Sequence, residues 1–189
     1  MKYIILAAIP EELPTLNKND NVFFTGLGKI NAAMSVTKHI IQSQPEIIYN
    51  YGTAGSTKDA KGLVECGTFI QRDIDCTPLG FEKFQTPFEP DDDILLRSTT
   101  HDMVPNLLTC STGDNFVTDD LDHEADVVDM EAYAIAKVCK KFDVSFRCFK
   151  YISDKTNQDS SNDWINCNFE DGENLFIKKM IELNVFDSV

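Results

Sequence analysis

Apolar runs separated by helical patterns are the feature of this sequence that most limits its fold. Residues 2–8, "KYIILAA", lack the alternation of polar and apolar positions that a half-exposed strand shows. Such a run is typical of a strand buried on both faces, as in a parallel sheet covered by helices. Apolar residues at helical spacing predict helices over 29–43 and 130–142. The alternation of predicted strands with predicted helices along the chain therefore indicates an α/β fold with a mostly parallel sheet.

The remaining segments continue this pattern, with one irregular insertion. Strands are expected in "NVFFTGLG", "PEIIYNYGTAG", "GTFIQRDIDC", "LLTCSTGDNFV" and "SFRCFKYIS", and a glycine turn is expected to end the second of these. Residues 77–105 hold four of the seven prolines and the acidic run 91–93, which predicts an irregular segment with a short strand at "ILLRS". "DKTNQDSSND" predicts a loop, and 164–183 a final helix. Without a visible repeat or linker, residues 1–189 are interpreted as a single domain.

Charge and cysteine content argue against several classes of function. The formal net charge of −14 repels phosphate backbones and anionic lipid surfaces, so neither a nucleic acid nor a membrane is expected as a partner. No apolar run approaches the roughly 18–20 residues of a membrane span, and the N-terminal run is interpreted as a strand rather than a signal peptide. The six cysteines show no CxxC spacing, so we expect no metal, no cofactor and a reducing, cytoplasmic environment.

Polar residues and glycines gather where the predicted strands end. Such positions meet at one edge of a parallel sheet, where ligands of α/β proteins bind. Each segment by itself could be only a turn, but five of them in one chain indicate a ligand site. They are Glu11 with Glu12, Gly26 with Gly28, the run 52–55, the run 113–116, and Ser153 with Asp154.

In this order along the chain, these segments resemble the purine nucleoside phosphorylase and methylthioadenosine/S-adenosylhomocysteine nucleosidase superfamily. "VVDMEAYAIAKVCKKFDVSFRCFKYISD" is similar to its C-terminal motif, in which a Met-Glu helix start is coupled to a strand that ends in Ser-Asp. "MKYIILAAIPEEL", "GLGKINAAM", "NYGTAGS" and "STGDNFV" resemble its other loops. The resemblance covers most of the chain and implies a shortened, single-domain, three-layer α/β/α fold with a central mixed, mostly parallel sheet.

The resemblance assigns three carboxylates to cleavage of the N-glycosidic bond between a ribose and a purine. Asp154 would protonate purine N7, which requires a raised pKa; its spacing also fits a cap of a following helix or turn. Glu131 would accept hydrogen bonds from both ribose hydroxyls, although an acidic residue in a first helical turn also interacts favourably with the helix dipole. Glu12, rather than Glu11, would contact the attacking water, or else be only a solvated charge.

Further residues are implied to contact the substrate. Phe116 would stack on the base, and the backbone of Val117 would read the edge of the base. Asn115 replaces a small residue of the family, and Met130 would line the sugar pocket. Trp164 would lie over the 5′ side of the sugar, or would only pack against the last helix. The strand-end residues that complete the substrate-binding set are Ile9, Thr53, Ala54, Gly55 and Ser153.

The basic residues favour water over phosphate as the nucleophile. A phosphorylase must bind a phosphate dianion, preferably with the planar fork of an arginine. None of Arg72, Arg97 and Arg147 lies in the glycine-containing loops, and the acidic pair after the first strand would repel phosphate. Lys150, also in the substrate-binding set, stands where the nucleosidases have an arginine. It keeps the charge of that arginine but not the fork.

The resemblance, together with this charge pattern, therefore implies a purine nucleosidase whose substrates are 5′-modified adenosines such as methylthioadenosine or S-adenosylhomocysteine. A nucleosidase for another purine nucleoside or nucleotide, a phosphorylase, and a catalytically silent nucleoside-binding protein remain alternatives. The resemblance also implies a homodimer, because family members commonly complete the active site across a subunit interface. The aromatic-rich residues 72–90 could shape the 5′ pocket or a dimer contact.

Overall fold

The computed structural model describes residues 2–89, 94–119 and 121–187, so the acidic run 91–93 lies outside the described residues. The strands are β1 (Tyr3–Ala7), β2 (Val22–Phe24), β3 (Ile47–Ser56), β4 (Leu63–Gln71), β5 (Leu96–Arg97), β6 (Leu108–Thr112), β7 (Val127–Asp129) and β8 (Ser145–Lys155). The α-helices are α1 (Lys29–Ser43), α2 (Ala132–Phe142), α3 (Ser160–Ile165) and α4 (Phe169–Glu182). Short 3-10 helices are η1 (Pro10–Glu12), η2 (Leu16–Lys18), η3 (Thr77–Leu79) and η4 (His101–Met103).

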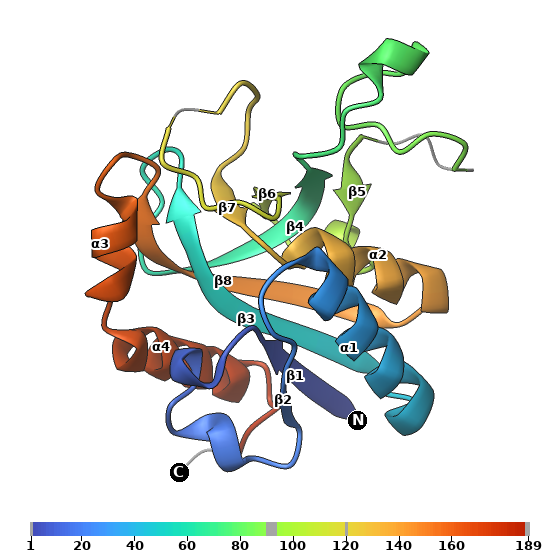
Figure 1. The fold of residues 1–189 in the computed structure, drawn as a ribbon. Coiled ribbons are helices and arrows are strands. Elements are labelled where there is room, and N and C mark those ends of the chain that lie inside the picture. The colour runs from blue at the N-terminus through green and yellow to red at the C-terminus, as the bar shows by residue number, and fades with distance from the viewer. Residues whose placement is uncertain (1, 90–93, 120, 188–189) are drawn as a thin grey trace.

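Within the described residues, the strands form one mixed sheet in the order β2-β1-β3-β7-β6-β4-β5 (Figure 1). β8 lies off this path, parallel to β3 and antiparallel to β4. Because β3 also pairs with β7, and β6 pairs with both β4 and β7, these five strands close into a ring. Parallel pairing predominates, which confirms the predicted mixed, mostly parallel sheet.

Helices cover the sheet through two apolar cores. α1 and α2 lie side by side over one core, to which they contribute Val36, Ile40 and Ile135 (Figure 1). α4 lies over the second core, where Phe176 and Met180 pack among residues of β1 and β3. The predicted α/β layering is therefore confirmed. No helix among the described residues is long and apolar enough to cross a membrane.

The helix predicted over 29–43 is confirmed with the same bounds, and the helix predicted over 130–142 begins two residues later. α1 follows Gly28, whose φ of 89° lies in the left-handed region that favours glycine. α1 and α2 each end at a residue in the left-handed conformation, Gln44 and Asp143 respectively. The described residues of the segment 77–105 are irregular as expected, apart from two 3-10 helices, and the short strand predicted in 94–98 is confirmed as β5.

Three local predictions are wrong. The run 52–55 is not a turn, because β3 continues to Ser56 and is paired there with both β7 and β8. The segment predicted as a polar loop contains the end of β8 and the beginning of α3. The final helix is two helices, α3 and α4, separated by residues 166–168. For the run 52–55 and for the end of β8, pairing with distant strands outweighs the local propensity.

Gly172 allows α4 to approach the sheet closely. A Cβ atom at this position would lie 2.5 Å from Tyr51 Oη and 2.7 Å from ring atoms of Tyr151. The ring of Tyr51 is itself buried and lies 4.6 Å from the ring of Phe176, so it has little room to move. Gly172 is therefore a packing requirement, although glycine is a poor helix former.

We expect Gly172→Ala to destabilise the protein by about 1–3 kcal/mol, because overpacking outweighs the gain of about 1 kcal/mol in helix propensity. The measurement is the free energy of unfolding in urea. Asn174→Ala, at an exposed position of the same helix, is the control and should be neutral or stabilising. Equal stabilisation by both variants would contradict the close approach.

Candidate active site

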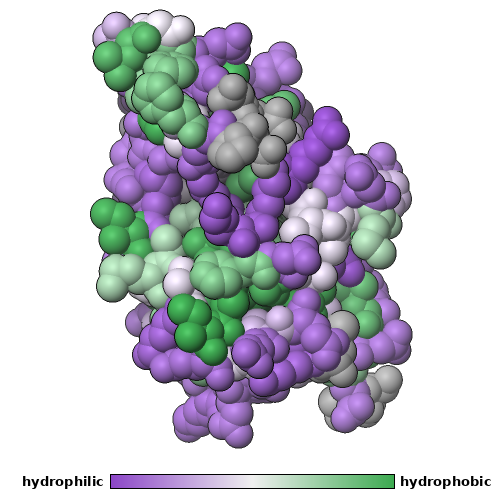
Figure 2. All heavy atoms as spheres, turned by 90° about the vertical axis from the view of Figure 1, so that its right-hand side faces the viewer, coloured by the Kyte–Doolittle hydropathy of each residue, from purple (hydrophilic) through white to green (hydrophobic). Residues whose placement is uncertain are grey.

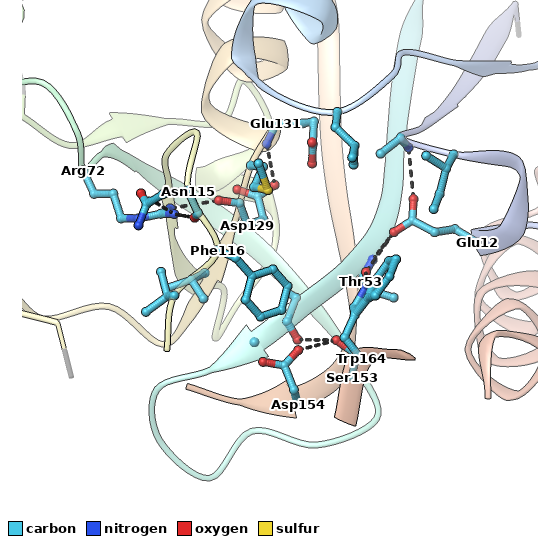
Figure 3. A pocket seen from close by; sticks show the side chains of 18 residues that line it. Glu12, Thr53, Arg72, Asn115, Phe116, Asp129, Glu131, Ser153, Asp154 and Trp164 are labelled. Carbon is cyan, nitrogen blue, oxygen red and sulfur yellow. Dashed lines mark hydrogen bonds between the residues drawn. The ribbon is translucent and has the colours of Figure 1, made fainter. Parts of the chain in front are cut away.

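A cavity of about 210 Å³ lies where β1, β3, β7 and β8 end (Figure 3). Its wall is mostly apolar, with carboxylates at four positions. The residues that line it are Ala8, Ile9, Glu12, Leu27, Thr53, Ala54, Gly55, Arg72, Asn115, Phe116, Val117, Val128, Asp129, Met130, Glu131, Ser153, Asp154 and Trp164. The strand ends that the sequence predicted to form a ligand site therefore meet at one cavity.

The predicted site residues reach this cavity with one exception. The three carboxylates Glu12, Glu131 and Asp154 line it, and Glu11 is exposed and does not. The exception is Lys150, which we expected to contact substrate but which lies behind the cavity wall and is 1% exposed. The other predicted residues that line the cavity are Ile9, Thr53, Ala54, Gly55, Asn115, Phe116, Val117, Met130, Ser153 and Trp164.

Glu12 is held by three hydrogen bonds. Its Oε1 accepts hydrogen bonds from the backbone N–H of Thr53 at 2.7 Å and from the Thr53 hydroxyl at 2.9 Å. Its Oε2 accepts one from the backbone N–H of Ala8 at 3.0 Å. A Cβ atom at Gly52 would lie 3.2 Å from Glu12 Oε1, so glycine in β3 makes this approach possible. Glu12 is buried, and its carboxylate has a fixed orientation.

Asp154 owes its orientation to an irregularity in β8. Ala54 pairs with Ile152, but Gly55 pairs with Asp154, so Ser153 is an additional residue on β8. Such a bulge redirects side chains and is frequent beside active sites. The Ser153 hydroxyl donates a 2.6 Å hydrogen bond to Asp154 Oδ1, and burial raises the pKa of Asp154. The cap of α3 is Asp159 rather than Asp154, so Asp154 does not cap that helix.

Glu131 stands at the N-terminus of α2 but does not cap that helix. The cap is made by Asp129, whose Oδ2 accepts hydrogen bonds from the backbone N–H groups of Ala132 at 2.7 Å and Glu131 at 3.2 Å. Glu131 Oε1 instead accepts a 2.8 Å hydrogen bond from the backbone N–H of Gly28. Burial, together with the neighbouring charge of Asp129, raises the pKa of Glu131 to about 7.

Lys150 forms a buried ion pair with Asp129. Lys150 Nζ lies 2.8 Å from Asp129 Oδ2, and both side chains are 1% exposed. Burial by itself would lower the pKa of Lys150, but Asp129 and other neighbours hold that pKa well above its usual value. Burial would likewise raise the pKa of Asp129, but Lys150 lowers it below its usual value. Lys150 therefore compensates the charge of a carboxylate in the wall.

Arg72 lines the cavity, which its sequence context did not predict. Its Nη1 donates to the backbone carbonyls of Ser111 at 2.8 Å and Asp129 at 2.9 Å. Its Nη2 donates to the carbonyls of Gly113 and Asn115. The guanidinium thus ties β6 to β7 and to the segment 113–115. Its burial lowers the pKa of Arg72.

Phe116 and Trp164 provide aromatic surface at the cavity (Figure 3). Phe116 is 43% exposed and comes from the loop after β6. Trp164 comes from α3, and its Nε1 donates a 3.0 Å hydrogen bond to the Thr53 hydroxyl, which in turn donates to Glu12. Trp164 also makes an edge contact with Phe169 at the start of α4, so it both lines the cavity and packs against that helix.

The sequence predictions missed five residues of the cavity wall. Val128 and Asp129 directly precede Met130, and Ala8 directly precedes Ile9, so adjacency to a predicted site residue could have identified them. Leu27 lies between two glycines that were noted. Arg72 had no local signal, because only the pairing of β4 with β6 brings it to the cavity. Among the described residues, no group of three or more His, Cys, Asp or Glu side chains is arranged to hold a metal ion.

Apart from Arg72, the residues of the segment 72–89 lie outside the cavity wall. Lys83 pairs with Asp122, and the Phe84 ring lies 4.5 Å from the ring of His123. Lys137 of α2 pairs with Glu89 at 2.8 Å. Residues of the segment 72–89 therefore pack on the segment around His123 and on α2, and only Arg72 among them lines the cavity.

Comparison with known proteins identifies the family of the chain. A family model described as the phosphorylase superfamily matches residues 15–183. The 5′-methylthioadenosine/S-adenosylhomocysteine nucleosidase of Exiguobacterium sp. is 33% identical over 158 residues, which cover 72% of this chain and 68% of that protein. The protein of the same name from Staphylococcus epidermidis is 30% identical over 178 residues, covering 83% of this chain and 78% of that one.

A solved structure shares the whole fold. The 5′-methylthioadenosine/S-adenosylhomocysteine nucleosidase of S. pneumoniae, determined with the transition-state inhibitor MT-ImmA, superposes with a TM-score of 0.83. The sequence identity is 23%, and the match covers 99% of this chain and 100% of that one. The fold, the strand-end cavity and the sequence similarity agree with one another. The chain belongs to the phosphorylase superfamily.

Proposed function

We propose that this chain is a nucleosidase that hydrolyses the N-glycosidic bond of 5′-modified adenosines, with methylthioadenosine and S-adenosylhomocysteine as substrates. The observation that carries the proposal is the convergence of three buried carboxylates, those of Glu12, Glu131 and Asp154, on one cavity. Relatives with 33% and 30% identity are named for this activity. Hydrolysis requires a proton donor for the base, a group that binds the ribose and an oriented water molecule.

Asp154 donates the proton in this proposal. Burial raises its pKa, which favours the protonated form that a general acid needs. Its Oδ1 is engaged by Ser153, which leaves Oδ2 to face the base. As the bond from C1′ to N9 breaks, its electron pair moves onto the purine. Protonation of N7 then neutralises the departing base.

Glu131 binds the hydroxyl groups of the ribose. One of its oxygens is fixed by the N–H of Gly28, and acceptor positions remain on both oxygens for the 2′- and 3′-hydroxyls. The ionised carboxylate also stabilises the positive charge that develops on the sugar as the bond breaks, so it acts on the barrier as well as on binding. Met130 lies next to it in the wall and excludes water from the sugar.

Glu12 orients the nucleophilic water. Three of the acceptor positions on its carboxylate are occupied by Thr53 and Ala8, and Oε2 retains a free position for water. The water oxygen attacks C1′, and one water proton passes to Glu12 as the new C–O bond forms. Because Trp164 orients the Thr53 hydroxyl, the direction of this carboxylate is specified by two further side chains.

The cations near the cavity favour water over phosphate. Arg72 is the one arginine in the described wall, and its Nη1 and Nη2 groups donate to protein carbonyls. At the N-terminus of α1, the N–H groups of Gly28 and Lys29 donate to the carboxylates of Glu131 and Asp114. The Nη1 and Nη2 groups of Arg72 and these two N–H groups already have protein acceptors, which disfavours the binding of a phosphate dianion by them.

An apolar row on α1 supports a homodimer as the functional form. Ile30, Met34 and Ile41 are 73%, 69% and 63% exposed, and Leu27 at the cavity rim continues the row. Figure 2 views the side on which α1 and α2 lie in Figure 1, where apolar patches interrupt the hydrophilic surface. A second copy of the chain on this row would bury it.

The cytoplasm is the proposed location, because it keeps thiols such as the six free cysteines reduced.

The proposal predicts release of adenine from methylthioadenosine and S-adenosylhomocysteine without phosphate. Asp154→Asn should lower kcat by about 10²–10⁴-fold because it removes the general acid. Asp59→Asn, which changes a carboxylate that is 96% exposed, should not. Base release from these two substrates, adenosine, inosine and AMP is measured with and without phosphate. AMP should be a poor substrate, because the wall carries four carboxylates.

Three outcomes would contradict the proposal. Base release only in the presence of phosphate would identify a phosphorylase. Faster turnover of inosine or AMP than of the thioether substrates would change the substrate class. Binding of methylthioadenosine without release of a base from any substrate would identify a nucleoside-binding protein.

The raised pKa of Glu131 predicts a pH dependence of stability. The pKa of Glu131 is near its ordinary value of 4.5 in the unfolded chain and about 7 in the folded protein, so the folded state binds more protons between these values. The free energy of unfolding should therefore fall as pH rises through this window, by about 2–3 kcal/mol relative to Glu131→Gln. Urea unfolding of both proteins from pH 4 to pH 8 measures the difference. A constant difference would contradict the raised pKa.

The ion pair behind the wall predicts a coupled effect on stability. Lys150→Met leaves Asp129 as a buried, uncompensated carboxylate and should cost about 3–5 kcal/mol. Lys178→Met, at an exposed position of α4, should change the stability by less than about 0.5 kcal/mol. Adding Asp129→Asn to Lys150→Met should recover part of the loss, because it removes the unpaired charge. Additive losses in urea unfolding would contradict the pairing.

A further inference from the structure

Glu173 is a fully buried carboxylate on α4, away from the cavity wall. It is 0% exposed, and no ion pair of Glu173 occurs within residues 2–89, 94–119 and 121–187. Its carboxylate accepts hydrogen bonds from two backbone N–H groups, that of Thr15 at 3.0 Å and that of Leu16 at 2.8 Å. A buried charge that is compensated only by backbone donors is costly, which calls for an explanation beyond helix packing.

These donors belong to the segment that carries Glu12. Glu12 is the last residue of η1, a single 3-10 turn closed by the N–H groups of Glu12 and Leu13. A turn of this length has little stability of its own. β1 holds its beginning, because only Ala8 and Ile9 separate that strand from η1. Glu173 holds the chain three residues beyond Glu12, so η1 is fixed from both sides.

Both α4 and Glu12 contact the same strand, β3. Tyr51 of β3 lies against Gly172 and Phe176 of α4, which places Glu173 next to the strand. Thr53, two residues further along β3, donates both of its hydrogen bonds to Glu12 Oε1. The position of Glu12 relative to Thr53 thus depends on how α4 holds the segment after η1.

We propose that Glu173 is a positioning residue for Glu12: its contacts with Thr15 and Leu16 keep the Glu12 carboxylate against Thr53 and Ala8. The inference rests on the proposed function for its kinetic consequence but not for its structural one. Glu173→Gln keeps the shape of the side chain and loses the charge-assisted hydrogen bonds. The loosened η1 would misplace the carboxylate that orients the water.

The test compares Glu173→Gln with Glu170→Gln, which removes the same charge at an exposed position of α4. Hydrolysis of methylthioadenosine should lose about 10- to 100-fold in kcat with little change in KM in Glu173→Gln only, as expected for a displaced group. In a Glu12→Gln background, the same change should have no further effect, because the group that it positions is already absent. A multiplicative loss in that background would overturn the proposal.

Amide hydrogen exchange tests the structural consequence without any substrate. The N–H groups of Ala8 and Thr53 donate to Glu12, so their protection should fall in Glu173→Gln and stay unchanged in Glu170→Gln. Unchanged protection in both variants would overturn the proposal even if the protein is not a nucleosidase. If Glu173→Gln does not fold, Glu173→Met keeps a similar volume, removes the buried charge and is measured in the same way.

Discussion

The carboxylate of Asp129 is the point on which the site depends. Its Oδ2 caps α2 and lies 2.8 Å from Lys150 Nζ, and its Oδ1 accepts a 2.5 Å hydrogen bond from Thr112. One buried side chain therefore joins β6, β7, β8 and the start of α2. It also leaves Glu131, at the helix N-terminus, without a capping role. The carboxylate of Glu131 is thus available for a ligand.

Burying several carboxylates around one cavity is unfavourable unless each has its own compensation. Asp129 has a lysine, and Glu12 has three hydrogen bonds from Thr53 and Ala8. Asp154 and Glu131 have less, and their pKa values are raised by burial. Because the compensation is unequal, chemically similar groups acquire different acidities. That difference is what acid–base chemistry at one site requires.

Much of the fold and of the candidate site could be predicted from local patterns. The apolar run of β1 and the helical spacing of α1 are properties of short windows, and both elements are found where they were expected. The Met-Glu and Ser-Asp positions were identified through the resemblance to the family motif, and all four residues line the cavity. Gly52 and Gly55 were misinterpreted as a turn, since the pairing of β3 with distant strands is not visible in the local sequence.

The sequence by itself determined the order of the elements, the segments that end at the cavity and three of the four carboxylates there. Only the tertiary structure decided what each charged group does. Lys150 was expected at the substrate and pairs with Asp129 instead, while Arg72 reaches the cavity from a distant strand. The physical reason is that burial and charge pairing depend on contacts between segments far apart in the chain. Residue type and spacing specify neither of them.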